Sequence, residues 1–189
     1  MIPDENDPAI NYIVFDLEAT CWPHRVPMDN MEIIEIGAVR LGSDLLPRDE
    51  FSFFVRPVLN PQLSDFCKNL TSIRQEQVDK AEDFKAVFLK FVEWAGSNPV
   101  TVCSWGQYDI KQITIDCARH GLPFPESFTN HINLKVLFAV RFTVKPCGMR
   151  KALEKLGLPL DGAHHRGIDD ARNIAKIAQI LLKTNSPAG

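Results

Sequence analysis

Short apolar runs alternate along this chain with longer stretches in which apolar and polar positions are mixed. Four of the runs have the length and the β-branched and aromatic content of strands: 12–15, 33–41, 51–56 and 100–103. The first run is apolar throughout, which predicts a strand that is buried on both faces and ends at Asp16. The turn-like segment 42–49 predicts that the second and third strands pair as a hairpin.

Apolar residues recur at helical spacing elsewhere in the chain and predict amphipathic helices. These helices are expected near 84–95, 110–118, 149–156 and 174–181. A short helix is expected near 63–69, whereas 133–142 fits either a strand or a helix. The order of these elements predicts an α/β fold in which helices flank a mixed β-sheet.

The length and composition are those of one compact globular domain. The chain has 189 residues, of which 45% are hydrophobic and 24% are charged, so disorder is not expected. We expect a single domain at 11–183 between flexible ends at 1–10 and 184–189. No apolar run is long enough to cross a bilayer, and 1–8 do not resemble a signal peptide. We therefore expect an intracellular, cytoplasmic protein that does not associate with membranes.

The five cysteines favour reduced thiols over disulfides or a zinc finger. Their number is odd, and no two of them have the CxxC spacing that is typical of such sites.

Asp16 and Glu18 are the first candidate functional residues. On a strand, alternate side chains point to the same face, so these two carboxylates lie together while Leu17 points to the core. Two neighbouring carboxylates repel each other unless a cation lies between them. Carboxylate oxygens suit Mg²⁺ or Mn²⁺. Taken alone, however, this pattern is common among solvated surface acids.

Two later segments add acidic residues beside predicted helix starts. Asp109 follows the strand at 100–103 and by itself fits a helix cap. His165 precedes the last helix, and Asp169 and Asp170 lie at its start, where the helix dipole favours carboxylates. Asp169 alone would serve as an N-cap. A histidine followed by two acids favours a functional site over simple capping.

Together the three segments resemble the DEDDh 3′→5′ exonucleases, which have the ribonuclease H-like fold. Asp16 and Glu18 match that family's first motif, and Asp109 matches its mid-chain aspartate. His165 and Asp170 match its third motif, a histidine, four residues and an aspartate.

Within this family the chain is most similar to one branch. That branch contains the RNAi-enhancing and histone-mRNA 3′ exonucleases and a bacterial sporulation-pathway inhibitor. The segments that carry the similarity are 16–21, 32–37, 63–67 and 165–170.

The resemblance implies an activity and its cofactors. It implies removal of nucleoside 5′-monophosphates from single-stranded 3′ ends, with RNA favoured by the branch. Two divalent ions, Mg²⁺ or Mn²⁺, would be held by Asp16, Glu18, Asp109 and Asp170, and His165 would accept a proton from the attacking water. Two alternatives remain: a proofreading or repair exonuclease acting on DNA, and a catalytically silent fold that binds nucleic acid or protein.

The net charge of −3 is compatible with a nucleic-acid substrate. The four candidate ligands contribute −4, so the rest of the chain sums to about +1. Two bound divalent ions would make the local field positive.

Four residues are candidates for substrate binding. In the family, the stretch matched by Ala19 and Thr20 contacts the last nucleotide, although Thr20 equally fits a local turn. Phe66, expected in a loop, and Tyr108 are candidates for stacking on terminal bases. The alternative for both aromatic residues is packing in the core.

Other noticeable residues are assigned no role. Trp105 is expected in the core. Trp22 could equally well cover the site or lie in a surface loop. Glu35 could either orient a group of the site or make a purely structural hydrogen bond. We expect structural roles, and no zinc site at the adjacent histidine pair, for the remaining histidines: His24, His120, His131 and His164.

Overall fold

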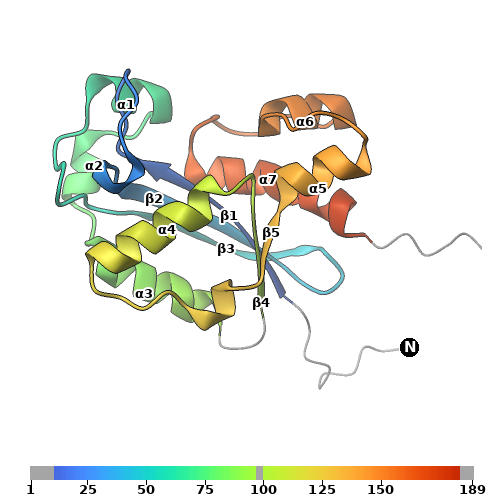
Figure 1. Cartoon of the computed structure of the whole chain (residues 1–189), viewed down its shortest axis with the longest axis horizontal. Helices are drawn as coiled ribbons and strands as arrows, with labels where there is room; N and C mark the ends of the chain where they lie inside the picture. Colours follow the sequence, from blue (N-terminus) through green and yellow to red (C-terminus); the bar gives the residue numbers. More distant parts are fainter. Residues whose placement is uncertain (1–10, 97–99, 184–189) are drawn as a thin grey trace, which may run out of the picture.

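A five-stranded mixed sheet forms the centre of the computed structural model, which describes residues 11–96 and 100–183 (Figure 1). Its strands lie in the order β3-β2-β1-β4-β5. β2 runs antiparallel to both β1 and β3, whereas β4 runs parallel to both β1 and β5. The strands are β1 Asn11–Ala19, β2 Ile33–Leu41, β3 Pro47–Phe54, β4 Val100–Ser104 and β5 His131–Asn133. The predicted mixed sheet and the hairpin of β2 and β3 are confirmed.

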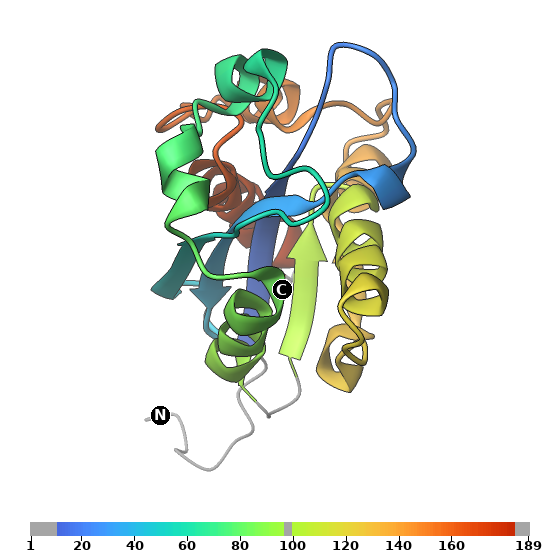
Figure 2. The same cartoon turned by 90° about the vertical axis from the view of Figure 1, so that its left-hand side faces the viewer.

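Helices cover both faces of this sheet. They are α1 Asp65–Thr71, α2 Gln75–Asp79, α3 Phe84–Ala95, α4 Tyr108–Arg119, α5 Leu134–Arg141, α6 Met149–Leu156 and α7 Gly167–Leu182, with 3-10 turns at Met28–Asn30 and Glu126–Phe128. In Figure 2, α4 and α7 lie on opposite sides of the strands. None of the helices in the described ranges is long and apolar enough to cross a membrane. The flexible ends predicted at 1–10 and 184–189 lie outside the described residues.

Alternating side chains of β1 face two separate cores. Phe15 and Leu17 belong to a core built with α3 and α4. Val14 belongs to the core built with α5, α6 and α7. Because side chains alternate along a strand, Asp16 and Glu18 share the face of Val14 and point toward α7. The predicted arrangement of the two carboxylates on one face is confirmed.

Two strand boundaries differ from those expected. β1 does not end at Asp16 but continues through Ala19, because Glu18 still pairs with Glu35 of β2 before a bulge interrupts the register. β3 begins at Pro47 rather than at the first phenylalanine of the run. Antiparallel pairing therefore extends into polar positions that carry no apolar strand signal.

Hydrogen bonds from capping side chains set where two helices begin: α5, in the segment 133–142 that fitted either a strand or a helix, and α1, the short helix expected near 63–69. Asn133 ends β5 and caps α5, since its side chain accepts a hydrogen bond from the Val136 amide. Ser64 caps α1 in the same way, through the amide of Cys67. The placement of Phe66 in a loop is therefore wrong, because Phe66 belongs to α1.

Helix α7 begins in tight contact with β2. A Cβ atom on Gly37 would lie 2.1 Å from the carbonyl carbon of Gly167, so only a glycine fits at this crossing. Glu35 is fully buried beside it and accepts hydrogen bonds from the Gly167 amide at 3.0 Å and from the Arg166 guanidinium at 3.2 Å. Glu35 thus anchors the start of the helix that carries Asp170.

Replacing Glu35 by Gln is expected to lower the free energy of unfolding by about 2 kcal/mol. Breaking a buried ion pair costs roughly 3–5 kcal/mol, and the loss is smaller here because Arg166 keeps some contact with solvent. The matched control is Glu50→Gln, which breaks a well-exposed pair between Arg172 of α7 and β3 and should cost under about 1 kcal/mol. Urea unfolding measures both values. Equal losses in the two variants would contradict the anchoring role of Glu35.

Candidate active site

All five catalytic candidates line one cavity of about 390 Å³. Asp16 and Glu18 enter it from β1, Asp109 from the start of α4, and His165 and Asp170 from the start of α7 and the loop before it. Trp105, Tyr108 and the first turn of α6 also line it. Three segments that are far apart in the sequence therefore meet at one place.

Three carboxylates form the centre of this cavity. One oxygen each of Asp16, Glu18 and Asp170 lies within 4.8 Å of the others. Desolvation, followed by repulsion from Asp109 and the neighbouring carboxylates, raises the pKa of Asp16 well above its usual range. Desolvation and repulsion from Asp170 raise the pKa of Glu18 to about 9. A divalent cation between these oxygens would relieve the repulsion, so this donor set fits a hard metal ion.

Asp109 lies beside this group at the second position of α4. Its Oδ1 accepts a hydrogen bond of 3.3 Å from the Leu17 amide, which ties α4 to β1. Burial raises its pKa to about 6, and hydrogen bonds, including one from Ser104, together with the nearby charge of Lys135, oppose that shift. The Ser104 hydroxyl in turn hydrogen-bonds with His131 at 3.0 Å, which gives His131 a structural role.

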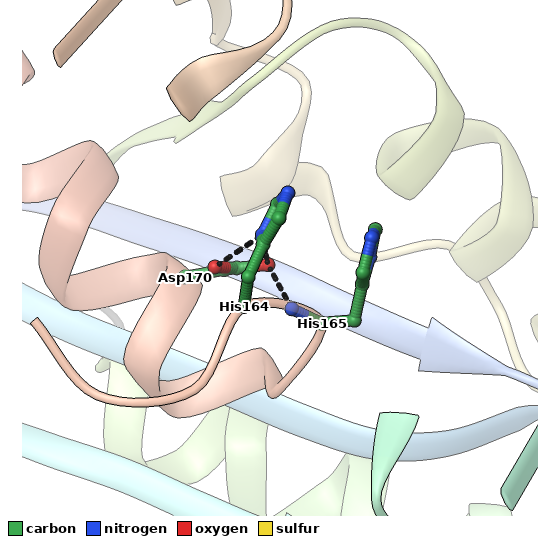
Figure 3. Close-up of side chains that lie close together, drawn as sticks. All are labelled: His164, His165 and Asp170. Carbon is green, nitrogen blue, oxygen red and sulfur yellow. Dashed lines mark hydrogen bonds and ion pairs between the residues drawn. The ribbon is translucent and has the colours of Figure 1, made fainter. Parts of the chain in front are cut away.

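His164, His165 and Asp170 form a compact group at the start of α7 (Figure 3). The backbone of His165 is left-handed, with a φ of 65°, and its amide donates to Asp170 Oδ2 at 3.0 Å. His164 Nδ1 lies 3.1 Å from each carboxylate oxygen of Asp170. The two imidazole rings stack with centroids 4.0 Å apart. Burial and the adjacent His164 lower the pKa of His165, although Asp170 opposes this.

His164 contacts a residue of the third motif, because its ring lies 3.1 Å from the Asp170 carboxylate. Consecutive residues in extended backbone point in opposite directions, which made this contact unexpected. The left-handed turn at His165 removes that alternation and brings both rings to the same side. The only signal in the sequence was the histidine next to the motif.

The four substrate-binding candidates lie in different environments. Tyr108 is 38% exposed and lines the cavity, whereas Phe66 is 40% exposed on α1 and does not line it. Ala19 is buried at the end of β1. Thr20 is also buried, and its hydroxyl accepts a hydrogen bond from the Glu32 amide at 3.0 Å. The Thr20 side chain is thus engaged in a local structural contact.

Two tryptophans are now placed. Trp105 is buried as predicted, and its Nε1 donates to the carbonyl of Cys147 at 3.0 Å. It also contributes to the wall of the carboxylate cavity. Trp22 lines a different surface cavity, together with Val26 and Leu59, so it does not roof the carboxylates.

Comparison with known proteins agrees with this geometry. The model of the exonuclease family RNase_T matches residues 13–178. Human 3′-5′ exoribonuclease 1 is 36% identical over 97% of this chain and 56% of its own length. Zebrafish (Danio rerio) ERI1 exoribonuclease 2 is 33% identical over 90% of this chain and 34% of its own length. The chain thus spans about half the length, or less, of these curated relatives.

A solved structure is similar over nearly its whole length. It is the nuclease domain of 3′hExo, a DEDDh family member bound to rAMP. It is 35% identical, with a TM-score of 0.87, and the match covers 95% of this chain and 94% of that one. On the strength of these matches, this chain belongs to the DEDDh family of exonucleases.

Proposed function

We propose that this chain is a 3′→5′ exonuclease that removes nucleoside 5′-monophosphates from single-stranded RNA 3′ ends. The convergence of Asp16, Glu18, Asp109, His165 and Asp170 on one open cavity carries this proposal. Relatives named as exoribonucleases and a neighbour bound to rAMP favour RNA as the substrate. A silent binding module would not need four acids in one cavity, where burial and repulsion from neighbouring carboxylates raise the pKa of Asp16 and Glu18.

The DEDDh family uses divalent metal ions, and we propose Mg²⁺ or Mn²⁺ for this chain. Asp16, Glu18 and Asp170 offer the clustered oxygens, and Asp109 adds a fourth carboxylate in the same cavity. Oxygen donors of this kind suit both ions. Two such ions, when bound, supply activation of the attacking water and neutralisation of the charge that develops on the leaving 3′ oxygen.

His165 is the proton acceptor in this proposal. Its lowered pKa keeps the imidazole neutral near pH 7, as a general base requires. The hydrogen bond from its own amide to Asp170 fixes the position of its backbone. Tyr108 and Trp105 form the aromatic part of the wall against which a terminal nucleotide would lie.

The RNA preference is tested with matched substrates. Single-stranded RNA and DNA of the same sequence are incubated separately with the protein and Mg²⁺ or Mn²⁺, and the initial rates are compared. The account predicts faster shortening of RNA. A higher rate on DNA would favour the alternative, a proofreading or repair exonuclease.

Removing the proposed stacking rings should weaken binding of single-stranded 3′ ends. Phe66→Ala and Tyr108→Ala are each expected to cost about 1–3 kcal/mol in binding, which is the usual loss for one aromatic–base stack. Phe53→Ala is the matched control, since Phe53 is 43% exposed on β3 and lines a different surface cavity together with Phe54 and Lys80. Fluorescence anisotropy with a short RNA measures all three. If neither Phe66→Ala nor Tyr108→Ala weakens binding beyond the control, the two residues have no stacking role.

We also propose that 11–183 form one exonuclease domain that works in the cytoplasm. None of the five cysteines forms a disulfide, and free thiols are compatible with a reducing compartment. The contacts of α7 with β1, β2 and β3, together with the shared cavity, support a single folding unit.

A further inference from the structure

Arg150 is the one arginine or lysine among the described residues that line the carboxylate cavity. It is the second residue of α6, on the side of the cavity formed by Gly148 and Met149. The titratable side chains on the other walls are four carboxylates, two histidines and a tyrosine. The lining therefore combines four carboxylates with a single arginine, and Lys135, whose charge acts on Asp109, does not line the cavity.

The Arg150 guanidinium is available for a ligand. Its ion-pair partner is Glu154, at 3.5 Å and one helical turn further along α6. The two side chains are 67% and 65% exposed, and an exposed pair of this spacing contributes only about 0.3–0.5 kcal/mol. The Arg150 guanidinium can therefore leave the Glu154 carboxylate and bind a phosphate at little cost in free energy. A guanidinium also presents paired N–H donors that match the oxygens of a phosphate.

Binding of a nucleic-acid strand at this cavity requires a cationic group such as the Arg150 guanidinium. The carboxylates repel every phosphate near the cavity, and metal ions held among them act mainly on the scissile one. We propose that Arg150 binds a phosphate of the strand upstream of the scissile bond and so positions the 3′ end in the cavity. This inference rests on the proposed exonuclease function. It makes Arg150 a positioning residue, which does not take part in bond cleavage.

Two substrates separate positioning from chemistry. One is a short single-stranded RNA, and the other is the p-nitrophenyl ester of a nucleoside 5′-monophosphate, which has a scissile bond but no upstream phosphate. The variants are Arg150→Ala, Arg150→Lys and Lys151→Ala. Lys151 is the matched control because it is an exposed cation next to Arg150 that does not line the cavity.

Arg150→Ala is expected to lower kcat/KM for the RNA about three- to tenfold, mainly through KM, as for one charged phosphate contact. Hydrolysis of the ester should be unchanged. Arg150→Lys should recover part of the loss, because it restores the charge without the paired donors. The slope of log kcat/KM against log salt concentration should become shallower by about 0.7 on RNA, the value for one phosphate of a single strand.

Three results would overturn the inference. Equal losses on the ester and the RNA would place Arg150 at the scissile phosphate, and an unchanged KM for RNA would leave it without a substrate contact. The same loss in Lys151→Ala would show a general effect of surface charge. Wild-type protein that hydrolyses neither substrate would instead overturn the proposed function itself, and the inference with it.

Discussion

Asp16→Asn is expected to abolish exonuclease activity while making the metal-free protein more stable. Asp16 is repelled by the three other carboxylates of the cavity, and under the proposal it is one of the residues that would hold the metal ions. Losing that ligand should remove several kcal/mol of transition-state stabilisation, or about a thousandfold or more in rate. A near-normal rate in this variant would contradict the assignment of the metal site.

The gain in stability follows from the direction of the pKa shift. The pKa of Asp16 is higher in the folded protein than in the unfolded chain. Ionised Asp16 therefore destabilises the metal-free fold once the pH rises above the unfolded value, and an uncharged amide removes that cost. Thermal unfolding with and without Mg²⁺ measures both effects.

The midpoint of wild-type unfolding should rise with added metal, whereas that of Asp16→Asn should start higher and respond less. The control is Asp44→Asn, because Asp44 is an exposed carboxylate paired with Arg48 on the hairpin turn and is remote from the cavity. This control should keep both the activity and the response to metal. A wild-type midpoint that does not change with metal would count against the metal site.

His165→Ala should lose roughly 10²–10⁴ in rate, the usual contribution of a general base, with little change in metal affinity. Asp170→Asn should lose metal affinity together with the rate. His165 and Asp170 lie next to each other, since the His165 amide donates to Asp170, so a difference between the two variants reflects the chemistry of the side chains and not their place in the fold. Single-turnover rates and calorimetric metal titration of both variants make the comparison, with the exposed His24→Ala as control.

The pH profile gives a second readout for His165. A general base must be neutral, so activity falls as pH decreases through its pKa. Since that pKa is lowered, the fall should occur below about 6.5, the ordinary value for imidazole. This acid limb should disappear in His165→Ala. A variant that keeps the limb, or that loses metal as Asp170→Asn does, would remove His165 from the general-base role.

Local periodicity predicted the parts of the site that depend on neighbours in sequence. The alternation of Asp16 and Glu18 on one face follows from strand geometry, as does the burial of Leu17. The helix that carries Asp170 follows from its apolar spacing. The end of β1 was misplaced because pairing of Glu18 with Glu35 continues the strand without any apolar signal.

Contacts between distant segments were not predictable from the sequence. Glu35 and Gly167 are 132 positions apart, and only the packing of α7 on β2 brings them together. The contact of His164 with Asp170 depends on one left-handed residue. Arg150 lies in an ordinary amphipathic helix, and only the tertiary structure brings it to the cavity. In each case the tertiary arrangement decides what the residue contacts.

The most direct test of the exonuclease function uses single-stranded RNA labelled at its 5′ end, incubated with the protein and Mg²⁺ or Mn²⁺. The account predicts a ladder that shortens from the 3′ end, with nucleoside 5′-monophosphates as the released product. Chelator or Asp16→Asn should abolish it. Activity that survives chelator unchanged, or products that come from internal cleavage, would contradict a metal-dependent 3′→5′ exonuclease.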